Sequence, residues 1–233
     1  SILHAARVCR AAADYIDDAA QAALESLRRE DDTLDAVGWL ELPEALRAPV
    51  LDTWLHAGGF GHPSDASRTE LERQAADAAS DSVPVVAWRN TEIRIWDGRL
   101  YAMPPLTALP EDWQSQWNGD ALALPGDCGM LFLETESHQV DGAHFDRPLQ
   151  VRLRRGGERI KPAGDPHTRE LRDLFQRARM PPWLRARCPL IYEDDELIAV
   201  ADLWISERGE TIFDARGARP HWTRSACFRS RLG

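Results

Sequence analysis

Basic residues and glycines gather between Arg152 and Arg187, the part of the chain best suited to bind a polyanion. This stretch holds 11 Lys+Arg against 4 Asp+Glu. Gly156 and Gly157 allow a loop to adopt positive φ angles and to bring backbone amides close to a ligand. Arginine side chains and free amides are groups that hold phosphate oxygens in nucleic-acid complexes. The segment therefore predicts a phosphate-binding loop.

A helix is predicted to follow this loop, from about 166 to 179. Its N-terminus, near Asp165-Pro166, would present free N–H groups that favour an anion. Its apolar side chains at helical spacing predict a buried face, formed by Leu171, Leu174, Phe175 and Ala178. A separate polar stripe holds Arg169, Arg172, Gln176 and Arg179. Pro181-Pro182 ends the helix, and Trp183 is predicted to be a packing anchor.

Nine basic side chains and three glycines form the predicted nucleic-acid site. The side chains are Arg154, Arg155, Arg159, Lys161, Arg169, Arg172, Arg179, Arg185 and Arg187. The glycines, whose backbone would bind an anion, are Gly156, Gly157 and Gly164. Glu170 and Asp173 weaken the positive field of the first helical turn, so residues 154–161 are weighted above that turn. The alternative is a solvated helix face, on which Asp173 and Arg177 form an i,i+4 ion pair.

Charge is divided unevenly along this chain of net charge −10. Residues 1–146 carry 10 Lys+Arg against 26 Asp+Glu, a net charge of −16, whereas residues 147–233 carry 18 against 12, a net charge of +6. Such asymmetry between halves indicates contact with a polyanion. The acidic part would repel a phosphate backbone and confine RNA to the basic part.

Other chemistries have weaker support, and no catalytic residue is predicted. Cys9, Cys188 or Ser225 would be the nucleophile of a hydrolase, but the sequence has no Gly-x-Ser-x-Gly elbow and no His-Glu-x-x-His pair. Four neighbouring side chains could be taken for metal ligands: His138, Asp141, His144 and Asp146. They lie in a polar stretch that is better explained as a solvated loop, so no metal site is predicted. The four cysteines are isolated from one another in the sequence: Cys9, Cys128, Cys188 and Cys227. We expect them to be small, partly buried apolar side chains of a protein in a reducing compartment.

The elements before residue 104 predict a helical domain, residues 1–104. Alanine and leucine recur at helical period from Ile2 to Arg29 and predict one long connecting helix over residues 1–30. Its apolar side chains need another element to pack against. Two further helices are expected, from Glu44 to about His56 and from about Asp65 to Ala79, with a glycine break between them. Apolar runs flanking Asp97-Gly98 predict a small antiparallel meander that closes the domain.

A linker over residues 105–125 and a small α+β domain over 126–233 are predicted to follow. Pro104-Pro105 marks the boundary. The second domain is expected to hold a mixed or antiparallel sheet, with strand candidates at 120–134, 148–154, 188–192 and 196–205. The predicted fold class of the whole chain is α+β. No apolar run approaches the ~20 residues that span a bilayer.

Four runs in and just after the basic segment are distinctive. They are Arg-Arg-Gly-Gly-Glu-Arg-Ile-Lys-Pro-Ala-Gly at 154–164, Leu-Arg-Asp-Leu-Phe-Gln at 171–176, Pro-Pro-Trp-Leu-Arg at 181–185 and Cys-Pro-Leu at 188–190. Together they closely resemble the C-terminal domain of tRNA(Ile)-lysidine synthetase, TilS. Upstream, the chain is similar to the helical substrate-recognition domain of that family. That similarity is carried by Trp54-Leu55, Pro63-Ser64 and Ile-Arg-Ile-Trp-Asp-Gly-Arg-Leu-Tyr at 93–101. The resemblance covers nearly the whole chain.

The resemblance implies an ATP-dependent ligase that joins lysine to the wobble cytidine of a minor isoleucine tRNA. In that family the chemistry belongs to an N-terminal PP-loop domain with a Ser-Gly-Gly-x-Asp-Ser signature, a motif that this sequence does not contain. The chain therefore resembles the C-terminal half, which holds and positions the tRNA without catalysing the reaction. ATP and magnesium are expected in the missing domain, and no cofactor is expected in this chain.

The resemblance also implies two partners, isoleucine tRNA and the N-terminal catalytic domain of the same polypeptide. We expect the protein to be cytoplasmic and not to contact a membrane. The sequence does not decide whether it forms a homodimer. The competing hypothesis is a protein-binding adaptor between domains that makes no RNA contact.

Overall fold

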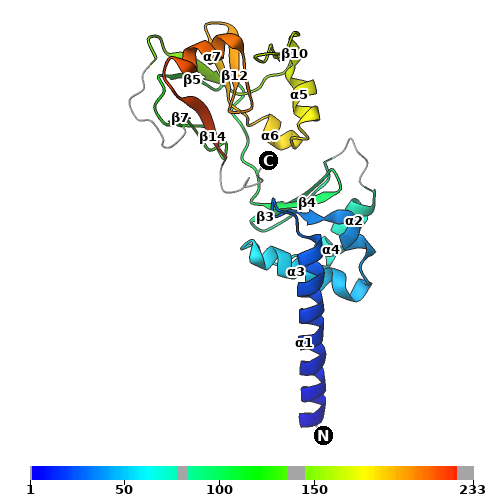
Figure 1. Cartoon of the computed structure of the whole chain (residues 1–233). Helices are drawn as coiled ribbons and strands as arrows, with labels where there is room; N and C mark the ends of the chain where they lie inside the picture. Colours follow the sequence, from blue (N-terminus) through cyan, green and yellow to red (C-terminus); the bar gives the residue numbers. More distant parts are fainter. Residues whose placement is uncertain (1, 78–82, 136–144, 225–233) are drawn as a thin grey trace. The chain divides into compact units, whose positions relative to one another are not determined.

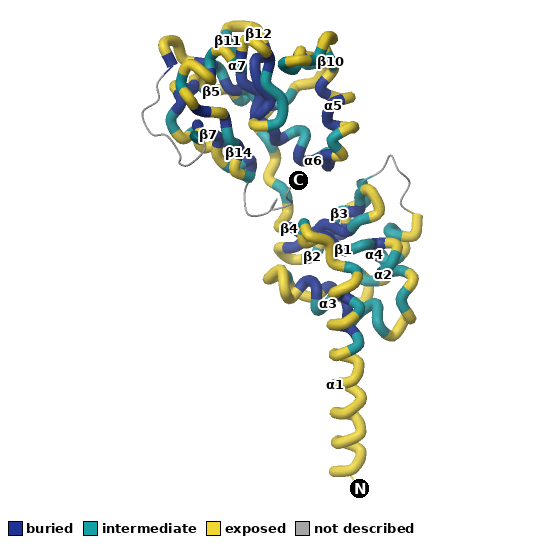
Figure 2. The backbone as a smooth tube through the Cα atoms, in the orientation of Figure 1, coloured by how far each residue is buried: buried dark blue, intermediate teal, exposed yellow. Residues whose placement is uncertain are grey.

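The computed structural model describes residues 2–77, 83–135 and 145–224 of the chain. They form two compact units, the first ending at Leu106 and the second beginning at Thr107 (Figure 1). Each unit combines helices with antiparallel strands around a buried apolar core, which Figure 2 shows as dark segments. The predicted α+β class is confirmed.

The first unit contains three helices that the sequence predicts and one that it does not. They are α1 (Ile2–Leu27), α2 (Ala36–Glu41), α3 (Glu44–Ala57) and α4 (Asp65–Asp77). Helix α3 begins directly after Pro43 and continues through Pro49. The short α2 lacks a long apolar period and depends on its cap, because the Asp35 carboxylate accepts a hydrogen bond of 3.0 Å from the Gly38 N–H.

A four-stranded antiparallel sheet completes the first unit and confirms the predicted meander. Its strands are β1 (Leu34–Asp35), β2 (Val85–Trp88), β3 (Thr91–Trp96) and β4 (Arg99–Met103), in the order β1-β4-β3-β2. The turn between β3 and β4 places both Asp97 (φ 54°) and Gly98 (φ 69°) at positive φ. That combination matches the twist of a tight hairpin. The sheet packs its apolar face into one core with the helices, centred on Trp39, Leu51 and Leu55.

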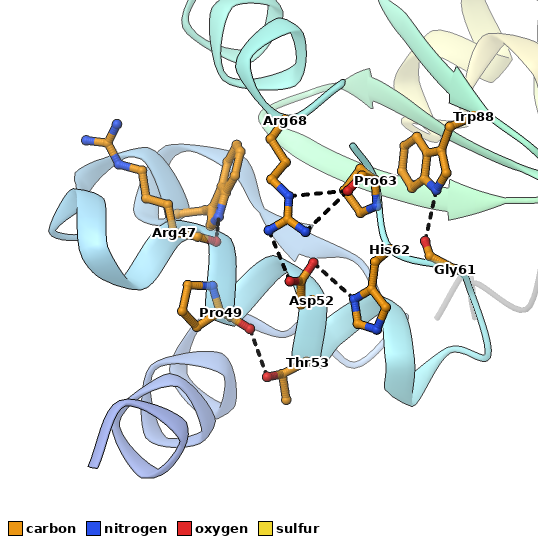
Figure 3. Close-up of polar contacts among 10 residues, drawn as sticks. Arg47, Pro49, Asp52, Thr53, Gly61, His62, Pro63, Arg68 and Trp88 are labelled. Atoms are coloured by element: carbon orange, nitrogen blue, oxygen red, sulfur yellow. Dashed lines mark hydrogen bonds and ion pairs between the residues drawn. The ribbon is translucent and has the colours of Figure 1, made fainter. Parts of the chain in front are cut away.

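The glycine break between α3 and α4 forms a structured connection (Figure 3). Asp52 of α3 lies 3.2 Å from His62 Nδ1 in the connection and 3.0 Å from the guanidinium of Arg68 in α4. On the sheet side, the Trp88 indole N–H donates a hydrogen bond of 2.9 Å to the carbonyl of Gly61. One carboxylate and one indole therefore join the connection to both helices and to the sheet.

Helix α1 is anchored in this core only by its last turns. Ala20 and Leu24 are buried there, whereas residues 2–18 are all exposed (Figure 2). The buried face continues along the exposed turns at spacings of three and four residues, through Ile2, Ala6, Cys9, Ala13 and Ile16. The long helix is confirmed, and its stripe is uncovered within the part of the chain that the structure describes.

The second unit is built on a five-stranded antiparallel sheet. Its strands are β5 (Gln114–Trp117), β8 (Leu149–Arg152), β11 (Leu190–Glu193), β12 (Glu196–Val200) and β13 (Trp204–Ile205). The order is β13-β12-β11-β8-β5. The strand expected over 196–205 is two strands, because Ala201 adopts a positive φ of 47° between them.

Two smaller antiparallel sheets and three helices complete the second unit. The strands are β6 (Leu122–Ala123), β7 (Met130–Glu134) and β14 (Arg219–Thr223) in one sheet, and β9 (Arg159–Ile160) and β10 (Arg169–Glu170) in the other. The helices are α5 (Leu171–Arg177), α6 (Pro182–Arg185) and α7 (Glu207–Asp214). Residues 105–125, expected to form a linker, instead include β5 and β6, and β5 pairs with β8 along its full length. Among the described helices, none is long and apolar enough to cross a membrane.

Candidate nucleic-acid interface

The predicted phosphate-binding loop connects β8 to the β9–β10 hairpin in the second unit. Gly156 has a φ of 105° and Gly157 a φ of 82°, values that residues with a Cβ rarely adopt. Strands β9 and β10 then pair antiparallel, and a turn containing Gly164 (φ 76°) joins them. These three positions therefore adopt positive φ angles, which glycine tolerates better than other residues.

The amides of the loop do bind an anion, but the anion is a side chain of the loop itself. The N–H groups of Arg155 and Gly156 both donate to Oε1 of Glu158, the latter over 2.7 Å. The side chain of Glu158 is 10% exposed. The predicted phosphate position at Gly156 is thus corrected, because a carboxylate already fills it.

The helix after the loop begins later than predicted. Helix α5 starts at Leu171, its N-cap is Glu170, and Asp173 lies in its first turn. Upstream, the Asp165 carboxylate accepts hydrogen bonds from the backbone N–H of His167 (2.9 Å) and from Arg169 Nε (3.0 Å). Such a local turn competes with helix formation, and the residue before a proline disfavours helical angles.

The expected anion site at a helix N-terminus near Asp165-Pro166 is therefore wrong. The actual N-terminus of α5 has Glu170 at its N-cap and Asp173 in its first turn, and their negative charges would repel a phosphate. The buried face of the helix is confirmed at Leu171, Leu174 and Phe175.

Five of the predicted cations are exposed, Arg155 in the loop and four more over the hairpin and α5. These four are Arg159, Lys161, Arg172 and Arg179. For the first three of these, no carboxylate of the described chain lies within the 4.0 Å of an ion pair. The Asp173–Arg177 ion pair of the solvated-face alternative does not form between these described residues, so Arg177 is a further exposed cation on this helix. We call Arg177 and the four side chains over the hairpin and α5 the exposed basic set.

Other predicted cations are engaged with groups of the protein. Arg155 remains half-exposed but lies 3.2 Å from Asp112, and Arg169 is paired with Asp165. Arg154 lies over the Phe175 ring at 5.7 Å.

Two arginines that follow α5 are held more deeply still. Arg185 donates a hydrogen bond of 2.6 Å to the Met180 carbonyl, and burial, with the Arg154 charge as the smaller cause, lowers the pKa of its guanidinium. Arg187 is 5% exposed and donates a hydrogen bond of 2.6 Å to the carbonyl of Thr107. Arg187 is thus corrected from a nucleic-acid contact to a structural tie, because a buried guanidinium cannot reach RNA.

The remaining candidates can be placed only in part. Trp183 is 6% exposed, which confirms a packing anchor. Cys128 and Cys188 are buried as expected, whereas Cys9 is exposed; Cys227 and Ser225 lie outside the described residues. Burial raises the pKa of the Cys188 thiol, a shift that opposes a nucleophilic role. His138, Asp141 and His144 also lie outside the described residues, and the described part of the chain has no metal-binding group of three or more side chains.

Comparison with known proteins places both units in one family. Residues 34–101 match the TilS substrate binding domain, and residues 149–222 match the TilS substrate C-terminal domain. A tRNA(Ile)-lysidine synthase of Xylella fastidiosa is 34% identical over 93% of this chain and 49% of its own length. The corresponding proteins of Xanthomonas campestris and Coxiella burnetii are 37% and 33% identical, over 78% and 95% of this chain and 41% and 49% of their own lengths.

The chain thus spans about half the length of these curated relatives. A solved structure, "Crystal structure of TILS C-terminal domain", covers 48% of this chain and 100% of its own, at 24% identity and a TM-score of 0.35, a value too low to support an argument about the fold. The two domain matches and the relatives agree with each other. The chain therefore belongs to the tRNA(Ile)-lysidine synthase family, of which it carries the substrate-binding and C-terminal domains.

Proposed function

We propose that this chain holds and positions an isoleucine tRNA for a catalytic domain that lies outside it. The observation that carries the proposal is the exposed basic set of the matched C-terminal domain. Within the described residues, Arg159, Lys161 and Arg172 have no carboxylate in ion-pair distance, in a chain whose overall charge is −10. In a strongly acidic protein, a polyanion would bind at such a cluster because the rest of the surface repels it.

The exposed basic set suits contact with the phosphate backbone better than the reading of base sequence. Its guanidinium and ammonium groups are exposed on a hairpin and a helix face. A-form RNA is recognised mainly through its shape, phosphates and 2′-hydroxyls. The second unit would therefore contribute affinity and placement, and the choice among similar tRNAs would arise from contacts spread over distant parts of the molecule.

In the full-length protein, the catalytic half would join lysine to the wobble cytidine of the tRNA in an ATP-dependent reaction. ATP and magnesium would bind in that half. Within this chain, the uncovered stripe of α1 is the surface that we assign to the catalytic domain, because it continues the buried face of Ala20 and Leu24 without interruption. Cytoplasmic location follows from a tRNA substrate and is part of the same proposal.

The test is a titration of the chain with isoleucine tRNA transcript over a series of salt concentrations. The variant replaces Arg159, Lys161 and Arg172 by alanine. Each lost phosphate contact should reduce the slope of log K against log salt by about 1. The control replaces Arg7, Arg10 and Arg89, which are exposed in the first unit, and removes the same three charges.

A smaller slope in the interface variant alone would support the proposed grip. Equal slopes in both variants would mean that net charge, not a localised interface, determines binding. If neither the wild-type chain nor the variants bind tRNA at low salt, the adaptor hypothesis would replace this one. In that case the full-length protein should bind tRNA equally well without residues 147–233.

A further inference from the structure

A second group of arginines, none of them a member of the exposed basic set, lines a cavity of the second unit. The cavity has a volume of about 350 Å³ and lies where β8 begins and β11 ends, beside α7. Arg147, Arg208 and Arg216 line it together with apolar side chains that include Phe145 and Ile212. We propose that this cavity binds a ribose–phosphate unit of the RNA backbone, an inference that rests on the proposed tRNA function.

Two of the three guanidiniums are held in place by carboxylates. Arg208 donates from two nitrogens to both oxygens of Glu193, each over 2.5 Å. Hydrogen bonding from Arg208 lowers the pKa of Glu193, with burial opposing it and the Arg208 and Arg147 charges adding to it. This carboxylate therefore stays ionised and keeps Arg208 oriented. Arg216 donates a hydrogen bond of 2.8 Å to Asp146.

The third guanidinium is available to a ligand. Arg147 is exposed, and no carboxylate of the described chain is recorded within ion-pair distance of it. Three guanidiniums against the carboxylates of Glu193 and Asp146 leave the lining with one net positive charge. A phosphodiester carries one negative charge, and its free oxygens match the planar fork of an arginine.

The size and the lining of the cavity favour a sugar attached to that phosphate. Its volume lies at the lower end of the range for small-molecule pockets, about 300–1,000 Å³. The lining includes Phe145, 8% exposed, whose ring is fixed by edge-to-face contacts with Trp117 (5.3 Å between centroids) and Phe213 (6.0 Å). Apolar and cationic side chains in one lining can contact the sugar and the phosphate of the same ligand.

The cavity and the loop at Gly156 and Gly157 lie at opposite ends of β8, so the cavity is a separate contact site. Strand β8 runs from the cavity toward the phosphate-binding loop, with Arg147 before the strand and Arg154 after it. The four residues of β8 rise about 3.3 Å each, so the ends of the strand alone lie roughly 10 Å apart. One phosphate cannot reach both ends, so contacts made by the two sites should add.

The experiment compares an Arg147→Ala/Arg216→Ala variant with an Arg7→Ala/Arg219→Ala control of equal charge, both exposed outside the cavity. Binding of isoleucine tRNA transcript is measured over a salt series, with thermal melting to select temperatures at which both proteins are folded. We expect the cavity variant to lose about 1 to 2 in salt slope, and Arg147→Lys alone to retain the wild-type slope because it keeps the charge. A slope and affinity equal to the control would overturn the inference.

Two further arms separate the possible failures. If the Arg159/Lys161/Arg172 variant weakens binding and the cavity variant does not, the proposed function stands and the cavity proposal falls. If neither variant alters binding, both fall. Cytidine 5′-monophosphate serves as the free probe: binding to the wild type that persists unchanged in the presence of saturating tRNA would show a free-nucleotide site and overturn the assignment to RNA backbone.

Discussion

At the scale of single residues, Glu158 decides how much of the loop a phosphate can use. Its carboxylate accepts hydrogen bonds from two backbone amides that the sequence predicts would bind a phosphate. A pattern of glycines and arginines predicts that a loop can hold an anion, but it cannot show which anion occupies it. That choice depends on a side chain three residues away turning back onto the loop. The same limit applies to Arg187, whose burial arises from long-range packing against Thr107.

Replacing Glu158 by alanine should free the amides of Arg155 and Gly156. We expect tRNA affinity to increase severalfold, since a phosphate can then replace the lost carboxylate, and we expect stability to fall by about 1–2 kcal/mol from the unmade hydrogen bonds. Fluorescence titration and urea unfolding measure the two effects. Unchanged or weaker tRNA binding in a folded Glu158→Ala protein would show that the loop amides do not face RNA.

Replacing Arg187 by alanine should have the opposite pattern. The change leaves the Thr107 carbonyl and the Asp127 carboxylate, 3.8 Å away, without their buried partner. We expect the free energy of unfolding to fall by about 3 kcal/mol, with no change in the tRNA salt slope where the protein remains folded. Arg159→Ala is the matched control, in which the slope should change and the melting temperature should not.

The buried thiol of Cys128 predicts a loss of stability at alkaline pH. Burial raises its pKa to about 11 from 9.0, with the Arg187 charge opposing and the Asp127 charge adding to the shift. The unfolded state therefore releases the proton first, so this contribution is complete below pH 9 and is lost as the pH rises from 9 to 11. Urea unfolding at pH 8 and pH 10.5 should show a decrease that is smaller in the Cys128→Ala protein, in which the buried thiol of Cys188 remains.

At the scale of elements, the sequence predicted what local periodicity determines. Helices α1, α3 and α4 and the β2–β4 meander follow from spacing and from one Asp-Gly turn. Strand β5, Gln-Ser-Gln-Trp, was placed in a linker because its alternation is polar and its partner β8 lies more than 30 residues further along the chain. Helix α5 began later than predicted because Asp165 closes a local turn that competes with helical hydrogen bonds.

One glycine shows how closely α7 packs against the sheet. A Cβ on Gly209 would lie 2.4 Å from the backbone oxygen of Ile198 in β12, and backbone cannot move aside as a side chain can. Gly209→Ala should therefore lower the melting temperature substantially, with a cost of at least about 2 kcal/mol from overpacking. Gly61→Ala, where nothing lies within 4 Å of the added carbon, should be near neutral. Similar melting of the two proteins would contradict this packing.

At the scale of the whole molecule, the two units carry different candidate surfaces. The second unit carries the exposed basic set and the arginine-lined cavity, whereas the first unit carries the uncovered α1. Deleting residues 2–16 should leave the melting temperature of the isolated chain nearly unchanged, because those residues contribute no buried side chain. In the full-length protein, alanine-to-aspartate changes at Ala6 and Ala13 should weaken the coupling between tRNA binding and turnover, which steady-state kinetics would detect.

The uncovered part of α1 also has a thermodynamic consequence for how the protein is assembled. A helical segment of this length that packs against nothing is only marginally stable in water, since nucleation is costly and propagation adds little per residue. Its order must then increase when a partner covers the stripe. Association would accordingly show the signature of folding coupled to binding, a large negative heat-capacity change together with an unfavourable entropy of ordering. If the proposed catalytic domain is that partner, the connection between it and this chain would become rigid only when the two associate.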